Sequence, residues 1–273
     1  MPYANTPAGK LYYETHGDGE PLLLHPGFGC TVEIYWRNTQ PLSERFRVIV
    51  FDPRGAGRSD DGPPTMLMKD FADDAAALLD ALAVDSAHVF GTSFGGMVAQ
   101  HIALEHPARV RRLVLGCTTA GGPSHVLPPA ENMLKFMAAS EITDPVAAMR
   151  STYFLNYSDG FAAEHDALLA ERALANQQLR STPEGRAGQL NAVQNHDTAS
   201  RLGEIEHPTF VAHGTDDGTV PLENGRALTA AIPNADLRLY PGGRHLFFTE
   251  CAAELNRDIA AFLTGSEDHL AAK

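Results

Sequence analysis

The chain has 273 residues, of which 44% are hydrophobic and 20% charged, as expected for an ordinary globular protein with one large domain or one domain carrying an insertion. Its formal net charge of −13 argues against a nucleic acid or an anionic membrane as partner, because either would require a basic face. No apolar stretch approaches the roughly 20 residues of a membrane span. Residues 1–19 are polar, so we expect no secretory signal.

The three cysteines, Cys30, Cys117 and Cys251, are odd in number and lack the spacing of metal ligands. This argues against a disulfide framework and favours a reducing, cytoplasmic location. Cys117 ends an apolar run, where a cysteine is more often a small buried hydrophobic residue than a reactive thiol. The sequence leaves the oligomeric state open, a homo-oligomer included.

Short, continuous apolar runs alternate with helical patterns along the chain. Such runs are typical of strands that are buried on both faces of a parallel sheet. Apolar residues at spacings of three and four predict helices between them. The predicted strands are Pro21–His25, Arg47–Phe51, Ala87–Gly91, Leu113–Gly116, Thr209–His213 and Ala235–Tyr240, and the predicted helices are Phe71–Val84 and Met97–His106. The alternation indicates an α/β fold with a right-handed, mostly parallel sheet flanked by helices.

The alternation stops at about residue 120 and resumes shortly before residue 209. In between, the pattern is helical, for instance over Ala130–Ser140 and Ala162–Gln178, and no strand is predicted. We therefore expect a core domain formed by residues 1–120 and 204–273, with a helical insertion, residues 121–203, in one loop of the sheet.

The segment Gly91-Thr92-Ser93-Phe94-Gly95 matches G-x-S-x-G, between a predicted strand and a predicted helix. In this context the pattern indicates a nucleophilic serine. Ser93 would occupy a sharp, strained turn with its hydroxyl exposed, and small residues beside it let strand and helix approach. The alternative is a capping serine in a glycine-rich turn.

A serine nucleophile requires a base, and His245 is the strongest of the twelve histidines. It lies in a loop after the last predicted strand and before the final helix. His25 and His213 also end predicted strands, where such residues more often satisfy hydrogen bonds near a site.

The base requires a carboxylate that fixes its tautomer, and the loop after the strand Thr209–His213 offers Asp216 and Asp217. Loops at the carboxyl edge of a parallel sheet build active sites. Chemistry alone does not decide between the two residues. Whichever is not the partner could cap the turn through its side chain.

The oxyanion of an acyl-transfer reaction needs N–H donors. One is expected from the backbone of Phe94, directly after the nucleophile. The other should come from the loop after the first buried strand, with Phe28 as first choice and Gly27 as second, because Pro26 has no N–H to donate.

Together these features resemble the α/β-hydrolase superfamily, in its branch of 3-oxoadipate enol-lactonases, esterases and haloperoxidase-like proteins, from about Leu11 to Leu263. The matching motifs are His25-Pro26-Gly27-Phe28-Gly29, Phe51–Ser59, Gly91–Met97 and Leu115–Thr119. The family's order of Ser, Asp and His agrees with Ser93, Asp217 and His245. Its acid loop, G-x-x-D-x-x-x-P, selects Asp217 over Asp216. Pro26 departs from the family's common His-Gly-x-Gly loop. The resemblance implies a supporting, structural role for Asp52 and Arg54.

The resemblance also implies that the helical insertion forms a cap that shapes the substrate pocket. Candidate pocket residues share a large apolar or aromatic side chain or lie in the loop near the nucleophile. They are Gly27, Trp36, Met133, Phe136, Met137, Tyr153, Phe154 and Tyr157. For each cap residue, packing within the cap is an equally good interpretation.

The sequence therefore predicts a cofactor-free and metal-free serine hydrolase that cleaves a small-molecule carboxylic ester or lactone through an acyl-enzyme. It contains no zinc-protease, nucleotide-binding or calcium-loop motif. Family members with the same triad also hydrolyse C–C or amide bonds, transfer acyl groups or make peracids. A non-catalytic ligand receptor on the same fold is a further alternative.

Overall fold

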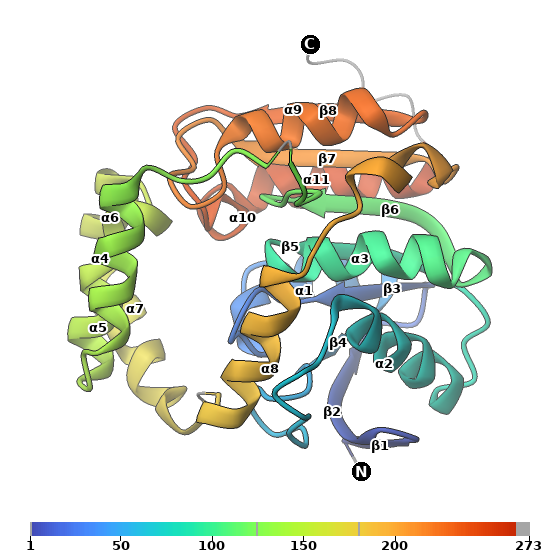
Figure 1. Ribbon diagram of the computed structural model, residues 1–273, viewed down its shortest axis with the longest axis horizontal. Coiled ribbons are helices and arrows are strands. Elements are labelled where there is room, and N and C mark those ends of the chain that lie inside the picture. Colours follow the sequence, from blue (N-terminus) through green and yellow to red (C-terminus); the bar gives the residue numbers. More distant parts are fainter. Residues whose placement is uncertain (1, 124, 180, 266–273) are drawn as a thin grey trace.

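An eight-stranded, mostly parallel sheet organises the part of the chain that the computed structural model describes, residues 2–123, 125–179 and 181–265 (Figure 1). In sheet order the strands are β1 (Tyr3–Thr6), β2 (Gly9–His16), β4 (Phe46–Phe51), β3 (Glu20–His25), β5 (Ala87–Thr92), β6 (Val110–Gly116), β7 (Thr209–Gly214) and β8 (Ala235–Tyr240). β1 pairs antiparallel with β2, and β2 with β4, whereas the remaining neighbours pair in parallel.

The predicted fold class is confirmed, and each predicted strand lies within or overlaps an observed one. The sequence did not reveal β1 and β2. These two strands form the antiparallel edge of the sheet and leave much of their surface in water. Their sequences consequently lack the continuous apolar runs by which the inner strands were recognised.

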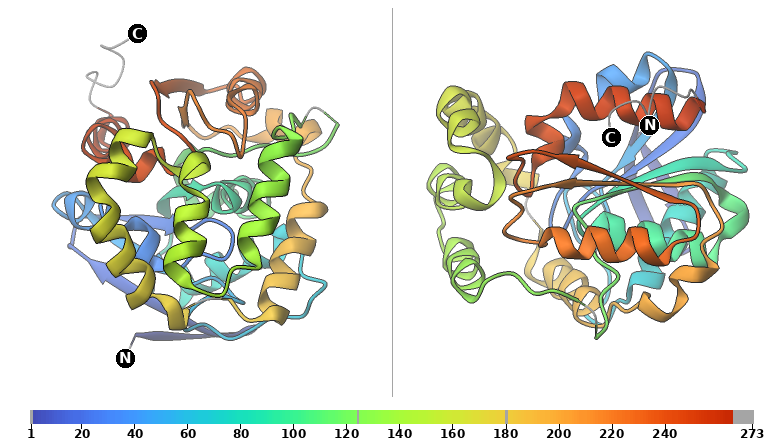
Figure 2. Two further views of the ribbon diagram at one scale, coloured as in Figure 1. Left: turned by 90° about the vertical axis from the view of Figure 1, so that its left-hand side faces the viewer. Right: turned by 90° about the horizontal axis from the view of Figure 1, so that it is seen from above.

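Helices cover both faces of the sheet, as the view from above shows (Figure 2). α1 (Thr39–Ser43) and α11 (Ala252–Thr264) lie on one face, and α2 (Met68–Ala81), α3 (Phe94–Glu105) and α9 (Leu222–Ala231) lie on the other. Alternate strand residues enter different cores: Leu23 packs with α2 and α3, whereas Leu22 packs with α1 and α11. This follows from the two-residue period of a strand, and it explains why the inner strands are apolar throughout.

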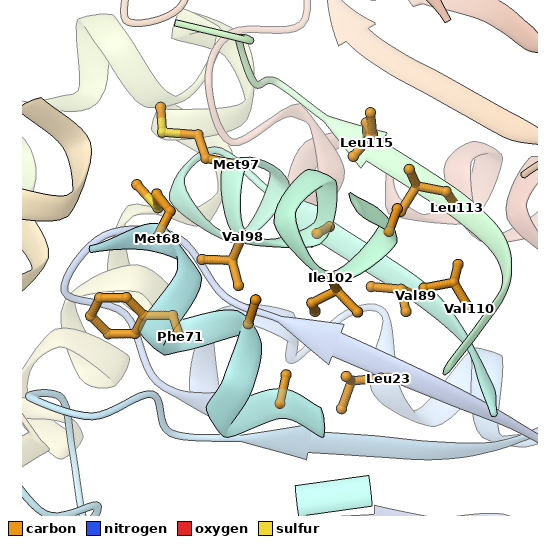
Figure 3. Packing of buried hydrophobic residues seen from close by; sticks show 14 of the residues in the cluster. Leu23, Met68, Phe71, Val89, Met97, Val98, Ile102, Val110, Leu113 and Leu115 are labelled. Atoms are coloured by element: carbon orange, nitrogen blue, oxygen red, sulfur yellow. The ribbon is translucent and has the colours of Figure 1, made fainter. Parts of the chain in front are cut away.

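The core between the sheet and helices α2 and α3 is well packed (Figure 3). Phe71 of α2 and Ile102 of α3 are buried together with Leu23 and Val89 of the sheet. Burial of each such side chain contributes about 1.5–3 kcal/mol to folding. This core fixes the position of α3, whose first residue directly follows Ser93.

The segment between β6 and β7 contains helices and no strand among its described residues (Figures 1 and 2). We call residues 121–203 the cap segment. Its helices are α4 (Ala130–Ser140), α5 (Pro145–Ser151), α6 (Tyr153–Asn156), α7 (Asp159–Ala175) and α8 (Pro183–Gln194). The short helices η1 (Val32–Tyr35), η2 (Pro107–Arg109), η3 (Gln177–Leu179), η4 (Ala199–Glu204) and α10 (Phe247–Glu250) complete the structure.

The cap segment has a small core of its own, which includes Tyr157, Phe161 and Leu169. Its returning part packs differently, because Ala192 of α8 and Leu202 of η4 belong to the main core beside the sheet. The division at residues 121 and 203 stays a prediction. None of the described helices combines the length and apolarity needed to cross a membrane.

Candidate active site

The residues singled out by sequence come together at the carboxyl edge of the sheet. Ser93 directly follows β5, and the loop that begins at His25 leaves β3 beside it. Asp217 lies in the loop after β7, and His245 in the loop after β8. Four segments far apart in sequence thus meet where parallel strands end, which is the usual location of sites in α/β sheets.

Ser93 lies in a strained turn between β5 and α3. Its backbone has φ 54° and ψ −118°, a conformation that L-residues rarely adopt. A Cβ at Gly91 would lie 2.1 Å from the carbonyl oxygen of Gly95, and one at Gly95 would lie 2.0 Å from that of His25. Neither contact is sterically allowed, so the turn requires glycine at both positions.

Ser93, His245 and Asp217 form a continuous hydrogen-bonded chain, which we call the candidate triad. Nδ1 of His245 is 2.9 Å from Oδ2 and 3.1 Å from Oδ1 of Asp217, and its Nε2 is 3.0 Å from Oγ of Ser93. Because an ionised carboxylate only accepts hydrogen bonds, the neutral imidazole carries its proton on Nδ1. Nε2 is then free to accept the proton of Ser93.

Asp217 is the carboxylate that the fold fixes. Its side chain is buried, and Oδ1 also accepts the backbone N–H groups of Thr219 and Val220 at 2.9 Å each. Asp216 is exposed and accepts a hydrogen bond from Thr215. Asp217 therefore contacts His245 and also caps its own turn. The capping role that the sequence offered to the second aspartate is filled by Asp217 and not by Asp216.

The two competing histidines are bonded to backbone carbonyl oxygens instead of Ser93, although Nε2 of His213 also lies 3.6 Å from Oδ2 of Asp217. His25 is fully buried with Nδ1 3.0 Å from the carbonyl oxygen of Pro26, and burial lowers its pKa to about 4. His213 is also fully buried, with Nε2 2.8 Å from the carbonyl oxygen of Val220, and burial lowers its pKa as well. Burial therefore favours the neutral form of both imidazoles, each of which is hydrogen-bonded to a carbonyl oxygen beside the site.

The loop from His25 to Cys30, which we call the oxyanion loop, runs next to the nucleophile. A Cβ at Gly27 would lie 3.6 Å from Cβ of Ser93. The rings of Phe28 and Phe94 pack edge to face with centroids 6.4 Å apart. Within the described residues, neither the Phe28 N–H nor the Phe94 N–H has a protein acceptor, as expected for the two oxyanion donors predicted from sequence.

Asp52 and Arg54 are both buried, and each forms an ion pair. Asp52 binds the guanidinium of Arg58, with Nε 2.8 Å from Oδ2, and accepts the N–H of Val32 at 2.9 Å. Arg54 donates from Nε to Asp74 at 2.5 Å. These contacts are consistent with the supporting role expected for both residues.

Cys117 is fully buried, and its thiol lies near the acid and base of the candidate triad. Cys117, Asp217 and His245 offer donor atoms within 4.8 Å of one another, which is the spacing of a metal site. Burial, and next the charge of Asp217, raise the pKa of the Cys117 thiol well above its ordinary value. A protonated thiol and an imidazole already bound on both nitrogens are a poor donor set for a metal. The cluster fits a triad better.

The pocket candidates lie in different surroundings. Trp36 is half-buried with the guanidinium of Arg172 4.6 Å from its ring centroid. Tyr153 donates to Asp166 at 3.0 Å, Lys135 lies 4.9 Å from the ring of Phe154, and Tyr157 belongs to the core of the cap segment. Met133 and Met137 are exposed. Phe136 lines a cavity of about 340 Å³ between α4, α5, α7 and α8, which none of the candidate triad residues lines.

Three contacts between the cap segment and the site loops were not apparent from sequence. Asn132 of α4 donates to the carbonyl of Gly218 at 3.0 Å, beside Asp217. The N–H of His245 donates to the carbonyl of Leu155 at 3.0 Å. Gln189 of α8 accepts the N–H of Gly29 at 2.7 Å. Single polar residues on helices gave no signal for such contacts, because the contacts depend on how the cap segment packs.

The fold and the site define a class of protein: an α/β protein with a serine, a histidine and an aspartate joined at the carboxyl edge of a parallel sheet. The family model described as the alpha/beta hydrolase fold matches residues 20–250, and the chain belongs to this family. The resemblance inferred from the motifs is confirmed at this level, as is the assignment to a family of hydrolases.

Relatives that match nearly the whole chain carry different hydrolase names. The chain is 33% identical to a protein of Azorhizobium caulinodans named "Putative carbamate hydrolase RutD", over 90% of this chain and 92% of the relative. It is 32% identical to the 2-hydroxy-6-oxononadienedioate/2-hydroxy-6-oxononatrienedioate hydrolase of Paraburkholderia xenovorans, over 93% and 90%. The solved structure of Est816, an N-acyl homoserine lactone degrading enzyme, superposes with a TM-score of 0.77 at 28% identity and covers 96% of this chain and 100% of that one.

Proposed function

We propose that this hydrolase cleaves a carboxylic ester or lactone through an acyl-enzyme on Ser93. The observation that carries the proposal is the unbroken chain from Asp217 through His245 to Oγ of Ser93, with 2.9 and 3.0 Å between the bonded atoms. It gives the hydroxyl a base whose tautomer is fixed by a buried carboxylate.

In the first half of the reaction, Oγ of Ser93 attacks the carbonyl carbon and its proton passes to Nε2 of His245. The developing oxyanion accepts hydrogen bonds from the amides of Phe94 and Phe28, of which Phe94 also begins helix α3. Collapse of the tetrahedral intermediate breaks the bond to the alcohol oxygen. The alcohol takes the proton from His245 and leaves an acyl group on Ser93.

In the second half, a water molecule attacks the acyl carbon and gives a proton to His245. The second intermediate collapses, the acid leaves, and His245 returns the proton to Ser93. Asp217 stabilises the imidazolium in both halves without taking the proton. His245 is the only proton donor that the leaving alcohol and the regenerated serine require, so the candidate triad and the two amides are sufficient for ester hydrolysis.

We propose that the apolar part of the substrate extends into the open cavity of the cap segment, which is lined by cap residues and by none of the candidate triad. Its lining is mostly apolar, with Phe136, Ala148 and Met149, and includes the polar residues Asn176 and Arg186. A lining of this kind favours an apolar chain with few polar groups. Replacement of Phe136 by Ala should therefore change the preferred acyl chain length more than the rate with p-nitrophenyl acetate.

The names of the two relatives favour carbamate or C–C bond hydrolysis as the rival chemistries. A panel with a p-nitrophenyl acyl series, lactones, an N-alkyl carbamate and a vinylogous 1,5-diketone separates them by kcat/KM. We expect esters or lactones to be cleaved fastest, and Ser93→Ala to abolish the activity with circular dichroism unchanged. Faster cleavage of the carbamate or the diketone would contradict an ester or lactone as the substrate and identify the faster compound's bond type instead. Full activity of Ser93→Ala would refute the nucleophile.

We further place this activity in a reducing, cytoplasmic compartment, acting on a small molecule. Cys30, Cys117 and Cys251 are all unpaired, and burial raises the thiol pKa of each. A protein exported to an oxidising compartment more often pairs its cysteines. Fractionation of the producing cells tests this: enzyme activity in an extracellular or periplasmic fraction would contradict it.

A further inference from the structure

We propose that Gln189, in helix α8 of the cap segment, is a positioning residue that holds the oxyanion loop in its catalytic geometry. The inference rests on the proposed function, because it concerns the amide of Phe28 as an oxyanion donor. It adds a role for the cap segment beyond enclosing substrate: one of its side chains maintains part of the catalytic machinery.

Gln189 connects the oxyanion loop to a second core segment through both ends of its amide. Its side chain is fully buried. Oε1 accepts the N–H of Gly29 at 2.7 Å, and Nε2 donates to the carbonyl of Arg54 at 3.0 Å. Because the amide must place its acceptor toward Gly29 and its donor toward Arg54, the side chain has one satisfactory orientation.

The partner at the other end of this bridge is itself fixed. Nε of Arg54 is 2.5 Å from Oδ2 of the buried Asp74, and the backbone N–H of Gly55 is bonded to the carbonyl of Asp60 at 3.1 Å. The carbonyl of Arg54 is therefore held in place, and its hydrogen bond with Gln189 fixes the Gln189 side chain relative to the core.

Helix α8 approaches the core closely at the same place. Gly185 and Gly55 lie in backbone contact, so that a Cβ on Gly185 would lie 2.3 Å from Cα of Gly55. Gln189 lies four residues after Gly185, on the same face of α8. From the same helix, the guanidinium of Arg186 lies 5.4 Å from the centroid of the Phe28 ring. Only a glycine pair permits this approach, and the approach brings Gln189 within reach of Gly29.

The hydrogen bond to Gly29 bears directly on Phe28. Gly29 has φ +65°, and the N–H of Cys30 is bonded to the carbonyl of Gly27 at 3.1 Å. Phe28 consequently lies between two peptide groups that are each held by a hydrogen bond. Without Gln189 the Phe28–Gly29 peptide loses the acceptor of its N–H. The neighbouring Gly27–Phe28 peptide, which carries the Phe28 N–H, is then held only by the hydrogen bond from Cys30.

The test compares Gln189→Met, which keeps the size of the side chain but removes both hydrogen bonds, with the matched control Asn191→Leu. Asn191 lies on the same helix and donates to the carbonyl of Met66 at 2.9 Å, remote from the oxyanion loop. We expect Gln189→Met to lower kcat at least 10-fold with KM changed less than 3-fold, since loss of one oxyanion donor costs about 10²–10³ in kcat. Asn191→Leu should keep kcat within about 2-fold.

Two further measurements separate positioning from plain stabilisation. A trifluoromethyl ketone forms a tetrahedral adduct with the nucleophile. It should bind Gln189→Met at least 10-fold more weakly than Asn191→Leu, whereas the carboxylic acid product should bind the two variants with equal affinity. Hydrogen exchange in the peptide 26–31 should become faster in Gln189→Met only. Equal kcat and equal inhibitor affinity for the two variants would overturn the inference. If Gln189→Met does not fold, Gln189→Asn, one methylene shorter, decides by the same measurements.

The failure of this inference is distinguishable from failure of the proposed function. If the wild-type protein and Ser93→Ala have the same activity, the proposed function is wrong. If the wild-type protein is active, Ser93→Ala is inactive, and Gln189→Met behaves like Asn191→Leu, only the role of Gln189 is wrong.

Discussion

Replacement of Asp217 by Asn perturbs the candidate triad without changing the size of the side chain. Oδ1 of Asp217 accepts the amides of Thr219 and Val220, so an Asn side chain must keep its oxygen at that position. Its NH₂ group then takes the place of Oδ2, 2.9 Å from Nδ1 of His245. Facing a donor, Nδ1 becomes an acceptor, and the imidazole proton moves to Nε2.

An imidazole with its proton on Nε2 donates to Ser93 instead of accepting from it. The serine is no longer deprotonated during attack, and a loss of about 10⁴ in kcat is expected from this wrong tautomer. That loss corresponds to about 5 kcal/mol of transition-state stabilisation. Because substrate binding does not depend on the tautomer, KM should change little.

The assay is steady-state hydrolysis of p-nitrophenyl acetate, with Asp216→Asn as the matched control. Asp216 is the exposed neighbour, whose side chain accepts a hydrogen bond from Thr215, so its variant should keep kcat within about 2-fold. An Asp217→Asn variant that folds and retains more than a tenth of the wild-type kcat would refute the assignment of Asp217 as the orienting acid.

Three further outcomes are expected. Gly95→Ala should lower the free energy of unfolding by about 3 kcal/mol or more, measured with urea, because its Cβ would lie 2.0 Å from the carbonyl oxygen of His25. The control Gly160→Ala should not destabilise the fold, because no atom lies within 4 Å of its new methyl group. The pKa of His25 is lowered from 6.5 to about 4, so the native state binds fewer protons than the unfolded state and loses stability as pH falls from 6.5 to about 4. At about 1.4 kcal/mol per pKa unit, this loss is about 3 kcal/mol, and His25→Phe should remove it. Equal acid sensitivity of the wild-type protein and His25→Phe would contradict this expectation. Asn132→Leu, which removes the bond to Gly218 beside the acid, should lower kcat several-fold with unchanged chain-length preference; a changed preference with unchanged kcat would instead make Asn132 a pocket residue.

The inner strands, Ser93 and His245 could be located from sequence because their signals are local. A strand buried on both faces must be apolar throughout, and a serine at a sharp strand-to-helix turn must have glycines beside it, as Gly91 and Gly95 show. His245 could be singled out by its place after the last strand. Each inference required only a short window of sequence and the knowledge that parallel strands end at a common edge.

The choice between Asp216 and Asp217 shows where local reasoning stops. Both residues follow the same strand, and one step along the chain turns the side chain from water toward His245. Only the resemblance to the family favoured Asp217. The backbone of the loop, in which Asp217 accepts the N–H groups of Thr219 and Val220, explains physically why that residue points inward.

Gln189 and the cavity beside Phe136 could not be predicted, because both depend on how separate helices pack. Gln189 is one polar residue in a helix whose sequence does not reveal which core segment it will meet. Of the pocket candidates Met133 and Phe136, Phe136 lines the cavity and Met133 does not, and the contact of either residue with substrate stays a prediction. Helical periodicity tells which residues share a face, but what that face contacts is decided by tertiary structure.

The central claim is that Ser93 is a nucleophile activated by His245, and covalent labelling tests it most directly. The wild-type protein should react stoichiometrically with a fluorophosphonate, and peptide mass spectrometry should find the adduct on Ser93. Ser93→Ala should not react, and His245→Gln should react far more slowly because its serine lacks the base. A folded wild-type protein that never reacts, or an adduct on another residue, would contradict the account and favour a ligand receptor on the same fold.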